Sequence, residues 1–274
     1  MKWPKYWKEY AIPKPFNPME VPVRILRKMG YKSDSQGIID RFIRVNGAWE
    51  GHLQHTRSFI LKTITGKKIE NLVVYGSGWG LDLPLDELSG IAGHVMLYDL
   101  VHPAQVIHRL RKYKNVSAIQ ADITGGAVIR AYRAVKQYKR HGQKASPENI
   151  CAQAFQPDVD PDFTISLNIL SQIGIMITDY LKLYVPYDQE EIDRINCLLQ
   201  QSHLQLLMPG KSCLITDVKE FCYNDANQLV EATDTVNCPF PQSGFTESWD
   251  WQLDPLREYK PGYKTVSHVV AIEP

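Results

Sequence analysis

The sequence predicts an α/β fold with a mostly parallel seven-stranded sheet, an antiparallel C-terminal hairpin and an N-terminal helical extension. Helix-period apolar patterns dominate up to residue 66, and short apolar runs separated by helical or loop stretches begin at residue 70. At 274 residues and 44% hydrophobic content, the chain can bury one large core. We expect an arm and helical cap over 1–66 and a main domain over 67–274, with a basic insertion at about 124–160.

Composition excludes several classes of protein. Lysine plus arginine is 31 and aspartate plus glutamate is 30, so a surface coated throughout for nucleic acid or anionic lipid is not expected. No apolar run approaches the roughly 18 residues of a membrane span, and the first residues lack a signal-peptide pattern. Five scattered cysteines without a CxxC pair indicate reduced thiols rather than disulfides or a metal site. We therefore expect a soluble cytoplasmic protein without metal.

The N-terminal region predicts an arm followed by two helices. Five prolines and five aromatic residues alternate over residues 1–22, which favours an extended arm packed on the surface, or an arm that helps to cover a substrate pocket. A capping box at Ser33–Gln36 predicts a helix with one apolar face, consisting of Ile38, Ile39, Phe42 and Ile43. A second helix over about 48–64 carries Trp49, His52, Leu53, Thr56 and Ile60 at helical spacing.

The apolar runs after residue 70 predict the strands of the sheet. Five apolar runs fit buried strands, at 71–75, 94–98, 116–120, 163–167 and 212–216. A crossover helix with apolar residues between Ile192 and Leu206 precedes the last run, and Pro209 and Gly210 end it. Runs at 245–253 and 264–272 predict an antiparallel hairpin that closes the sheet.

A glycine-rich loop follows the first strand and is the most informative segment. It contains Gly76, Ser77, Gly78 and Gly80. Glycine allows a tight turn and lets a ligand approach the backbone, and the carboxyl ends of parallel strands form the usual binding crevice. Asp82 and Pro84 then suit the cap and first turn of a short helix.

Two acidic residues end the next two strands. Asp99 follows the second strand about 20 residues after the loop, where a carboxylate can accept hydrogen bonds from ribose hydroxyls. Asp122 ends the third strand, where it could meet an adenine amino group. For both residues a helix cap or turn is the alternative role. Together with the loop, they predict a nucleoside site.

Loop spacing excludes two competing phosphate-binding motifs. The dinucleotide pattern GxGxxG requires a third glycine where Leu81 stands, and no GK[ST] of a Walker loop follows. The acidic residues after the loop, Asp82, Asp86 and Glu87, suit a cationic ligand better than a pyrophosphate.

Over residues 70–274 the chain resembles the class I S-adenosylmethionine-dependent methyltransferases, which have a Rossmann-like fold. The matching segments are GSGWG at 76–80, Asp99, Ala121-Asp122, Ser166-Leu167-Asn168 and Leu207–Lys211. The resemblance implies S-adenosylmethionine as cofactor and cofactor contacts by Gly76, Ser77, Gly78, Gly80, Asp99, Asp122 and Asn168. One departure is Val74, which stands where the family usually has an acidic residue that recognises the methionine amino group.

The resemblance further implies methyl transfer to a small-molecule acceptor. Asn168 stands where the family often places a polar residue facing the acceptor, although the NPPY-type amino-methylation motif is absent. His52 is a candidate base on the second helix, and packing of that helix through Trp49 is the alternative.

Two other functions remain open. The segment 130–144 carries six basic residues and no acidic one, so it could contact RNA, although a solvated helix face is the simpler explanation. A methyltransferase-like protein that has lost its catalytic activity could use this segment as a scaffold or RNA-binding protein. The same cofactor also serves aminopropyl or aminocarboxypropyl transfer, which the loop sequence does not distinguish from methyl transfer.

Overall fold

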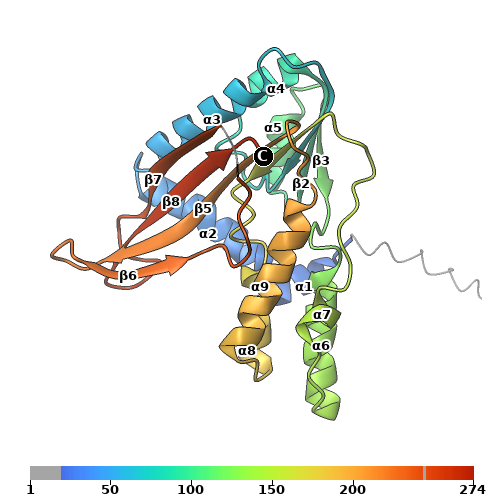
Figure 1. Cartoon of the computed structure of the whole chain (residues 1–274), viewed down its shortest axis with the longest axis vertical. Helices are drawn as coiled ribbons and strands as arrows, with labels where there is room; N and C mark the ends of the chain where they lie inside the picture. The colour runs from blue at the N-terminus through green and yellow to red at the C-terminus, as the bar shows by residue number, and fades with distance from the viewer. Residues whose placement is uncertain (1–19, 243–244) are drawn as a thin grey trace, which may run out of the picture.

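The computed structural model describes residues 20–242 and 245–274, so the predicted arm lies almost entirely outside the described residues. One sheet with strand order β3-β2-β1-β4-β5-β8-β7 forms the centre of the fold (Figure 1). The strands are β1 (Ile69–Tyr75), β2 (Ala92–Asp99), β3 (Val116–Gln120), β4 (Phe163–Leu167), β5 (Ser212–Tyr223), β6 (Leu229–Asp234), β7 (Thr246–Asp254) and β8 (Lys264–Ile272).

Nine helices are assigned among the described residues. They are α1 (Val23–Lys28), α2 (Tyr31–Arg44), α3 (Glu50–Ile64), α4 (Leu85–Ile91), α5 (Ala104–Leu110), α6 (Ala127–His141), α7 (Pro147–Ile150), α8 (Ile175–Tyr184) and α9 (Gln189–Leu204). Helices α1, α5, α7 and α8 were not predicted. None of the helices in 20–242 or 245–274 is both long and apolar enough to cross a membrane.

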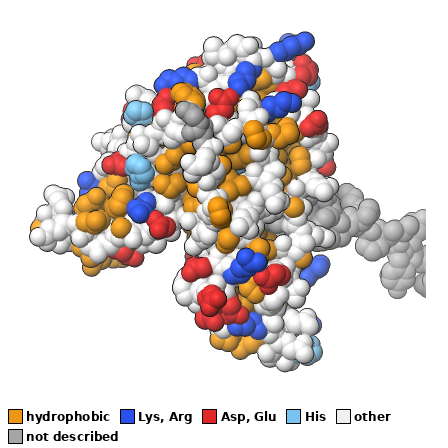
Figure 2. Space-filling view, in the orientation of Figure 1, with side chains coloured by type: hydrophobic (Ala, Val, Ile, Leu, Met, Phe, Trp, Pro, Cys, Tyr) orange, Lys and Arg blue, Asp and Glu red, His pale blue; other side chains and the backbone are white. Residues whose placement is uncertain are grey.

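The predicted fold class is confirmed. Strands β1 to β5 are parallel neighbours, and β8 pairs antiparallel with both β5 and β7. The unpredicted β6 pairs with the outer half of β5, which continues past its predicted end at Thr216. Because every residue of β6 is exposed, it lacks the buried alternation that marks a strand in sequence. Figure 2 shows hydrophobic side chains gathered on the projecting end of the sheet, where Leu229 and Val230 are exposed.

Alternation along β1 builds a core on each face of the sheet. Leu72 and Val74 pack in one cluster with α3, α4 and α5, whereas Val73 and Tyr75 pack in another with α1 and α6 to α9. Both faces of β1 are therefore covered, as its continuous apolar sequence predicts. The helices α6 to α8 extend away from the sheet at the bottom of Figure 1.

The start of α2 differs from the prediction. The helix begins at Tyr31 because Gly30 precedes it in a left-handed conformation with φ 91°. Ser33 Oγ donates a hydrogen bond to the Gly30 carbonyl at 2.8 Å, so the predicted capping box at Ser33 is wrong. The predicted packed face is also wrong at Ile43, which is 67% exposed, while Ile38 and Phe42 pack against the core.

The second predicted helix is confirmed as α3, and His52, Leu53, Thr56 and Ile60 are buried as its helical spacing suggests. The predicted cap of the helix after the glycine loop is wrong. Helix α4 begins at Leu85 with Pro84 as its N-cap and no side-chain capping bond, because the Asp82 carboxylate is bonded elsewhere. The Asp82 carboxylate therefore lies at the carboxyl end of β4, beside Asn168.

Candidate nucleoside and methyl-donor site

The glycine loop packs directly on the end of β4. Gly76 has φ 81°, and a Cβ built there would lie 2.6 Å from the Leu167 carbonyl oxygen and 2.7 Å from Ile169 Cβ. Gly78 and Gly80 also have positive φ, of 41° and 58°. The loop therefore follows a path that residues with a side chain rarely adopt.

The loop is tied to the end of β2. The Gly78 amide donates to Asp99 Oδ2 at 2.8 Å, and the Val101 amide donates to Asp99 Oδ1 at 3.1 Å. Each carboxylate oxygen can accept a further bond, which ribose hydroxyls could supply. Burial raises the pKa of Asp99, although nearby His102 opposes this change. The predicted loop and carboxylate thus lie together.

Side chains from two other elements hold the loop. Arg109 Nη2 donates to the Trp79 carbonyl at 2.8 Å, and Trp79 Nε1 donates to the Ser35 carbonyl of α2 at 2.6 Å. Ser77 Oγ lies 3.1 Å from His102 Nε2 and is buried. The indole nitrogen of Trp79 is therefore bonded to α2 rather than to the glycine loop.

Asp122 has the turn role that was the alternative considered from sequence. Its Oδ1 accepts bonds from the Thr124 amide and hydroxyl, which makes a turn, and Gly125 N donates to its carbonyl. Its Oδ2 is buried and has no hydrogen-bond partner among the described residues. Burial raises the pKa of this fully buried carboxyl. Oδ1 therefore stabilises the turn that follows β3.

Tyr31 lies close to the strand-end carboxylates and was not singled out from the sequence. Its hydroxyl is buried and has no hydrogen-bond partner in the described part of the chain. Burial and the charges of Asp122, Asp34 and Asp99 raise the pKa of Tyr31, so its hydroxyl lies within electrostatic reach of both strand-end carboxylates. The sequence carries no signal for this position, which depends on where α2 crosses the sheet.

Asn168 and Asp82 meet at the end of β4. Asn168 has φ 49°, an uncommon conformation for a residue with a side chain, and its Nδ2 donates to Asp82 Oδ2 at 2.8 Å. Burial raises the pKa of Asp82 to about 6, although the bond from Asn168 and the charge of Arg57 oppose this shift. The Asn168 Oδ1 atom is buried without a partner among residues 20–242 and 245–274.

His52 lies behind Asn168 in an aromatic cluster. Its Nδ1 accepts a bond from Trp249 Nε1 at 3.1 Å, its Nε2 lies 3.3 Å from Asn168 Nδ2, and its ring stacks on Trp251 with centroids 4.1 Å apart. Burial lowers the pKa of His52 to about 3. His52 therefore lies next to Asn168, but its imidazole is a weak base.

Three buried polar atoms without a hydrogen-bond partner among the described residues belong to residues near the carboxyl ends of the parallel strands. They are Tyr31 Oη, Asp122 Oδ2 and Asn168 Oδ1. Buried polar atoms in folded proteins normally have a partner, and atoms that lack one often serve a ligand. Their donor and acceptor types fit a ligand with hydroxyl, amino and ammonium groups. No group of three or more histidine, cysteine or acidic residues in the described ranges is arranged to hold a metal ion.

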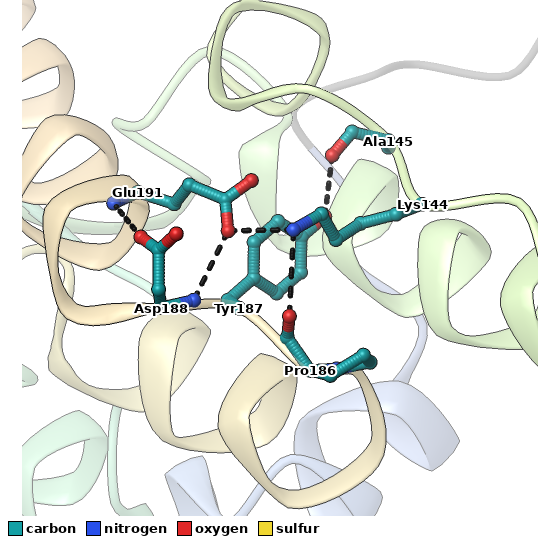
Figure 3. Close-up of polar contacts among 6 residues, drawn as sticks. All are labelled: Lys144, Ala145, Pro186, Tyr187, Asp188 and Glu191. Carbon is teal, nitrogen blue, oxygen red and sulfur yellow. Dashed lines mark hydrogen bonds and ion pairs between the residues drawn. The ribbon is translucent and has the colours of Figure 1, made fainter.

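The basic segment forms α6 and the loop after it. Arg130 is turned inward, with Nε donating to the Ile150 carbonyl at 2.7 Å and Nη1 to the Gly125 carbonyl at 3.0 Å. Lys144 binds Glu191 Oε2 at 2.6 Å beside Tyr187, which joins the loop to the start of α9 (Figure 3). Arg130 and Lys144 therefore stabilise the fold, while Lys136, Lys139 and Arg140 are exposed on α6.

The comparisons with known proteins found distantly similar solved structures but no similar sequence. No protein-family model matches the sequence, and the search of curated proteins found no match. The structure is similar to the N-methyltransferase NodS from Bradyrhizobium japonicum in complex with S-adenosylhomocysteine, at 11% identity over 81% of this chain and 87% of that chain (TM-score 0.38). It is also similar to a DhpI complex with S-adenosylhomocysteine, at 11% identity over 91% and 96% of the two chains (TM-score 0.40). The strand order, rather than this distant likeness, defines the fold.

Proposed function

We propose that this chain is an S-adenosylmethionine-dependent methyltransferase that transfers a methyl group to a small-molecule acceptor. The observation that carries the proposal is the bonded pair of Gly78 and Asp99, which places a left-handed glycine loop and a strand-end carboxylate at one edge. Polar side chains with unused bonding capacity, from Tyr31, Asp122 and Asn168, support it.

Each element of the site has a distinct part in binding. Asp99 accepts hydrogen bonds from the ribose hydroxyls, Asp122 Oδ2 accepts from the adenine amino group, and the Tyr31 hydroxyl supplies a further polar contact. The backbone of Gly76, Ser77, Gly78 and Gly80 lies against the ligand without Cβ atoms at the three glycines. The bound cofactor supplies an electrophilic methyl group on a sulfonium.

The chain itself contributes alignment and exclusion of water, since methyl transfer is an in-line displacement. Asn168 holds its amide at the β4 end, where it faces both the cofactor and the acceptor. His52 positions Asn168 and does not act as the base, because its Nδ1 accepts a bond from Trp249 and its pKa is about 3.

Titration calorimetry with S-adenosylhomocysteine tests the proposal. We expect saturable binding by the wild-type protein and at least about tenfold weaker binding by Asp99→Ala, because the ribose hydroxyls would lose their charged acceptor. The exposed loop residue Asp160 provides a control, and Asp160→Ala should bind as the wild type does.

Absence of saturable binding would refute the cofactor assignment. If binding is present, mass analysis of the cofactor product distinguishes methyl transfer, which yields S-adenosylhomocysteine, from aminopropyl transfer, which yields methylthioadenosine.

RNA binding through 130–144 stays a prediction. The exposed cations of α6, with no acidic residue from 123 to 147, are the observation that favours it. If these cations bind RNA, neutralising Arg133 and Lys136 together should weaken retardation of RNA in gels and reduce its dependence on salt. Unchanged retardation, or none in the wild type, would leave α6 as a solvated face.

A further inference from the structure

Asp82 is a half-buried carboxylate without an ion-pair partner among the described residues. No ion pair within 4.0 Å links it to a cation among the described residues, and its one side-chain hydrogen bond comes from the neutral amide of Asn168. Arg57 is the cation that lowers the pKa of Asp82, but its guanidinium donates to the Leu81 carbonyl. Burial outweighs these effects and raises the pKa to about 6. A negative charge in this position is stabilised by a ligand that brings a positive charge.

Strand order indicates which part of the ligand reaches Asp82. Asp122 and Asp99 end β3 and β2, the loop of Gly76 ends β1, and Asn168 ends β4, in that spatial order across the sheet. A nucleoside held by the two aspartates therefore directs its 5′ substituent across the glycine loop toward β4. Asp82 lies there because Asn168 holds its carboxylate.

The end of β1 offers no other carboxylate. Its last residues are Val73, Val74 and Tyr75, and Val74 is fully buried in the core shared with α3. The nearest following acidic residue, Asp86, is exposed on α4 and bonds to Lys112 and Tyr113. Asp82 is thus the carboxylate available at the border between β1 and β4.

We propose that Asp82, held in place by Asn168, binds the α-ammonium group of the cofactor's methionine portion. This inference rests on the proposed function. The Asn168 Oδ1 atom, which has no partner among the described residues, would give the ammonium a second acceptor. Asp82 is accordingly a cofactor-binding residue rather than a base for the acceptor.

Two ligands separate the ammonium contact from the nucleoside contacts. S-adenosylhomocysteine carries the amino-acid chain, whereas 5′-methylthioadenosine has the same nucleoside and thioether without it. In calorimetric titrations at pH 7.5, Asp82→Asn should weaken S-adenosylhomocysteine binding ~30-fold, because a charged hydrogen bond is lost. The same variant should bind methylthioadenosine within about twofold of the wild type. Asp86→Asn is the matched control and should leave both affinities unchanged.

A pH series on the wild type provides a measurement that needs no variant. The ammonium favours ionised Asp82, so binding of S-adenosylhomocysteine should weaken about tenfold between pH 7.5 and pH 5 and release protons near pH 6. Other groups around the site are Arg57 and His52, and His52 stays neutral because its pKa is about 3. Asp99 and His102 face the nucleoside, which both ligands share. Their contribution to the pH dependence of binding should therefore be the same for methylthioadenosine and can be subtracted from that of S-adenosylhomocysteine.

The outcomes distinguish this inference from the proposed function. Wild-type binding that Asp82→Asn leaves intact, with equal pH dependence for both ligands, overturns the ammonium contact and leaves the cofactor assignment standing. Equal weakening of both ligands by Asp82→Asn also overturns it, because Asp82 would then act through the shape of the loop. If the wild type binds neither ligand, the proposed function itself fails.

Discussion

Gly76→Ala is expected to destabilise the protein by roughly 3 kcal/mol, as the sum of left-handed strain of about 1 and crowding of about 2. The crowding is local and severe, since the new methyl group would lie 2.6 Å from the Leu167 carbonyl oxygen and 2.7 Å from Ile169 Cβ. Both neighbours follow or end a central strand, so neither can move without displacing β4. Urea unfolding at neutral pH measures the change.

Gly66→Ala is the matched control. Gly66 has φ 78°, close to that of Gly76, but a Cβ there meets nothing within 4 Å. We expect a loss of only about 1 kcal/mol from backbone strain. Equal losses in the two variants would show that the loop relaxes freely, and the close packing of the loop on β4 would then have no energetic consequence.

Between pH 7 and pH 5, His203 should reduce the free energy of unfolding by about 2 kcal/mol. This residue is 1% exposed, and its Nε2 lies 2.8 Å from Ser166 Oγ of β4. Burial lowers the pKa of His203 from 6.5 to about 4. Between these pKa values the unfolded chain binds a proton at this histidine that the folded chain does not. The free energy of unfolding therefore rises with pH in this window and decreases as pH falls.

His203→Gln isolates that contribution. The difference in unfolding free energy between pH 7 and pH 5 should be about 2 kcal/mol smaller in the variant than in the wild type. The comparison cancels the opposite effect of Asp82, whose raised pKa favours the folded state at low pH. The exposed His141 on α6 serves as control, and His141→Gln should keep the wild-type pH dependence. An unchanged difference in His203→Gln would contradict the assignment.

Prediction from sequence succeeded where the signal is local. The strand over 116–120 and the strand over 163–167 have the predicted bounds, because short apolar runs between polar turns specify a buried strand within a few residues. The glycine loop and Asp99 were also identified, since both occur directly at strand ends. Local patterns failed where a neighbouring residue competes, as at Gly30, which begins α2 before the capping box.

The sequence by itself determined the alternating α/β order, the parallel sheet with its antiparallel hairpin, and the loop with the two strand-end aspartates. Tertiary structure decided the rest of the candidate site: the pairing of Asp82 with Asn168, 86 residues away, the approach of Tyr31 to the strand ends, and the burial of His52 against Trp249. The physical reason is that these contacts join residues distant in the chain. Their geometry and their pKa values depend on how α2, α3 and β7 pack, and no local pattern encodes that packing.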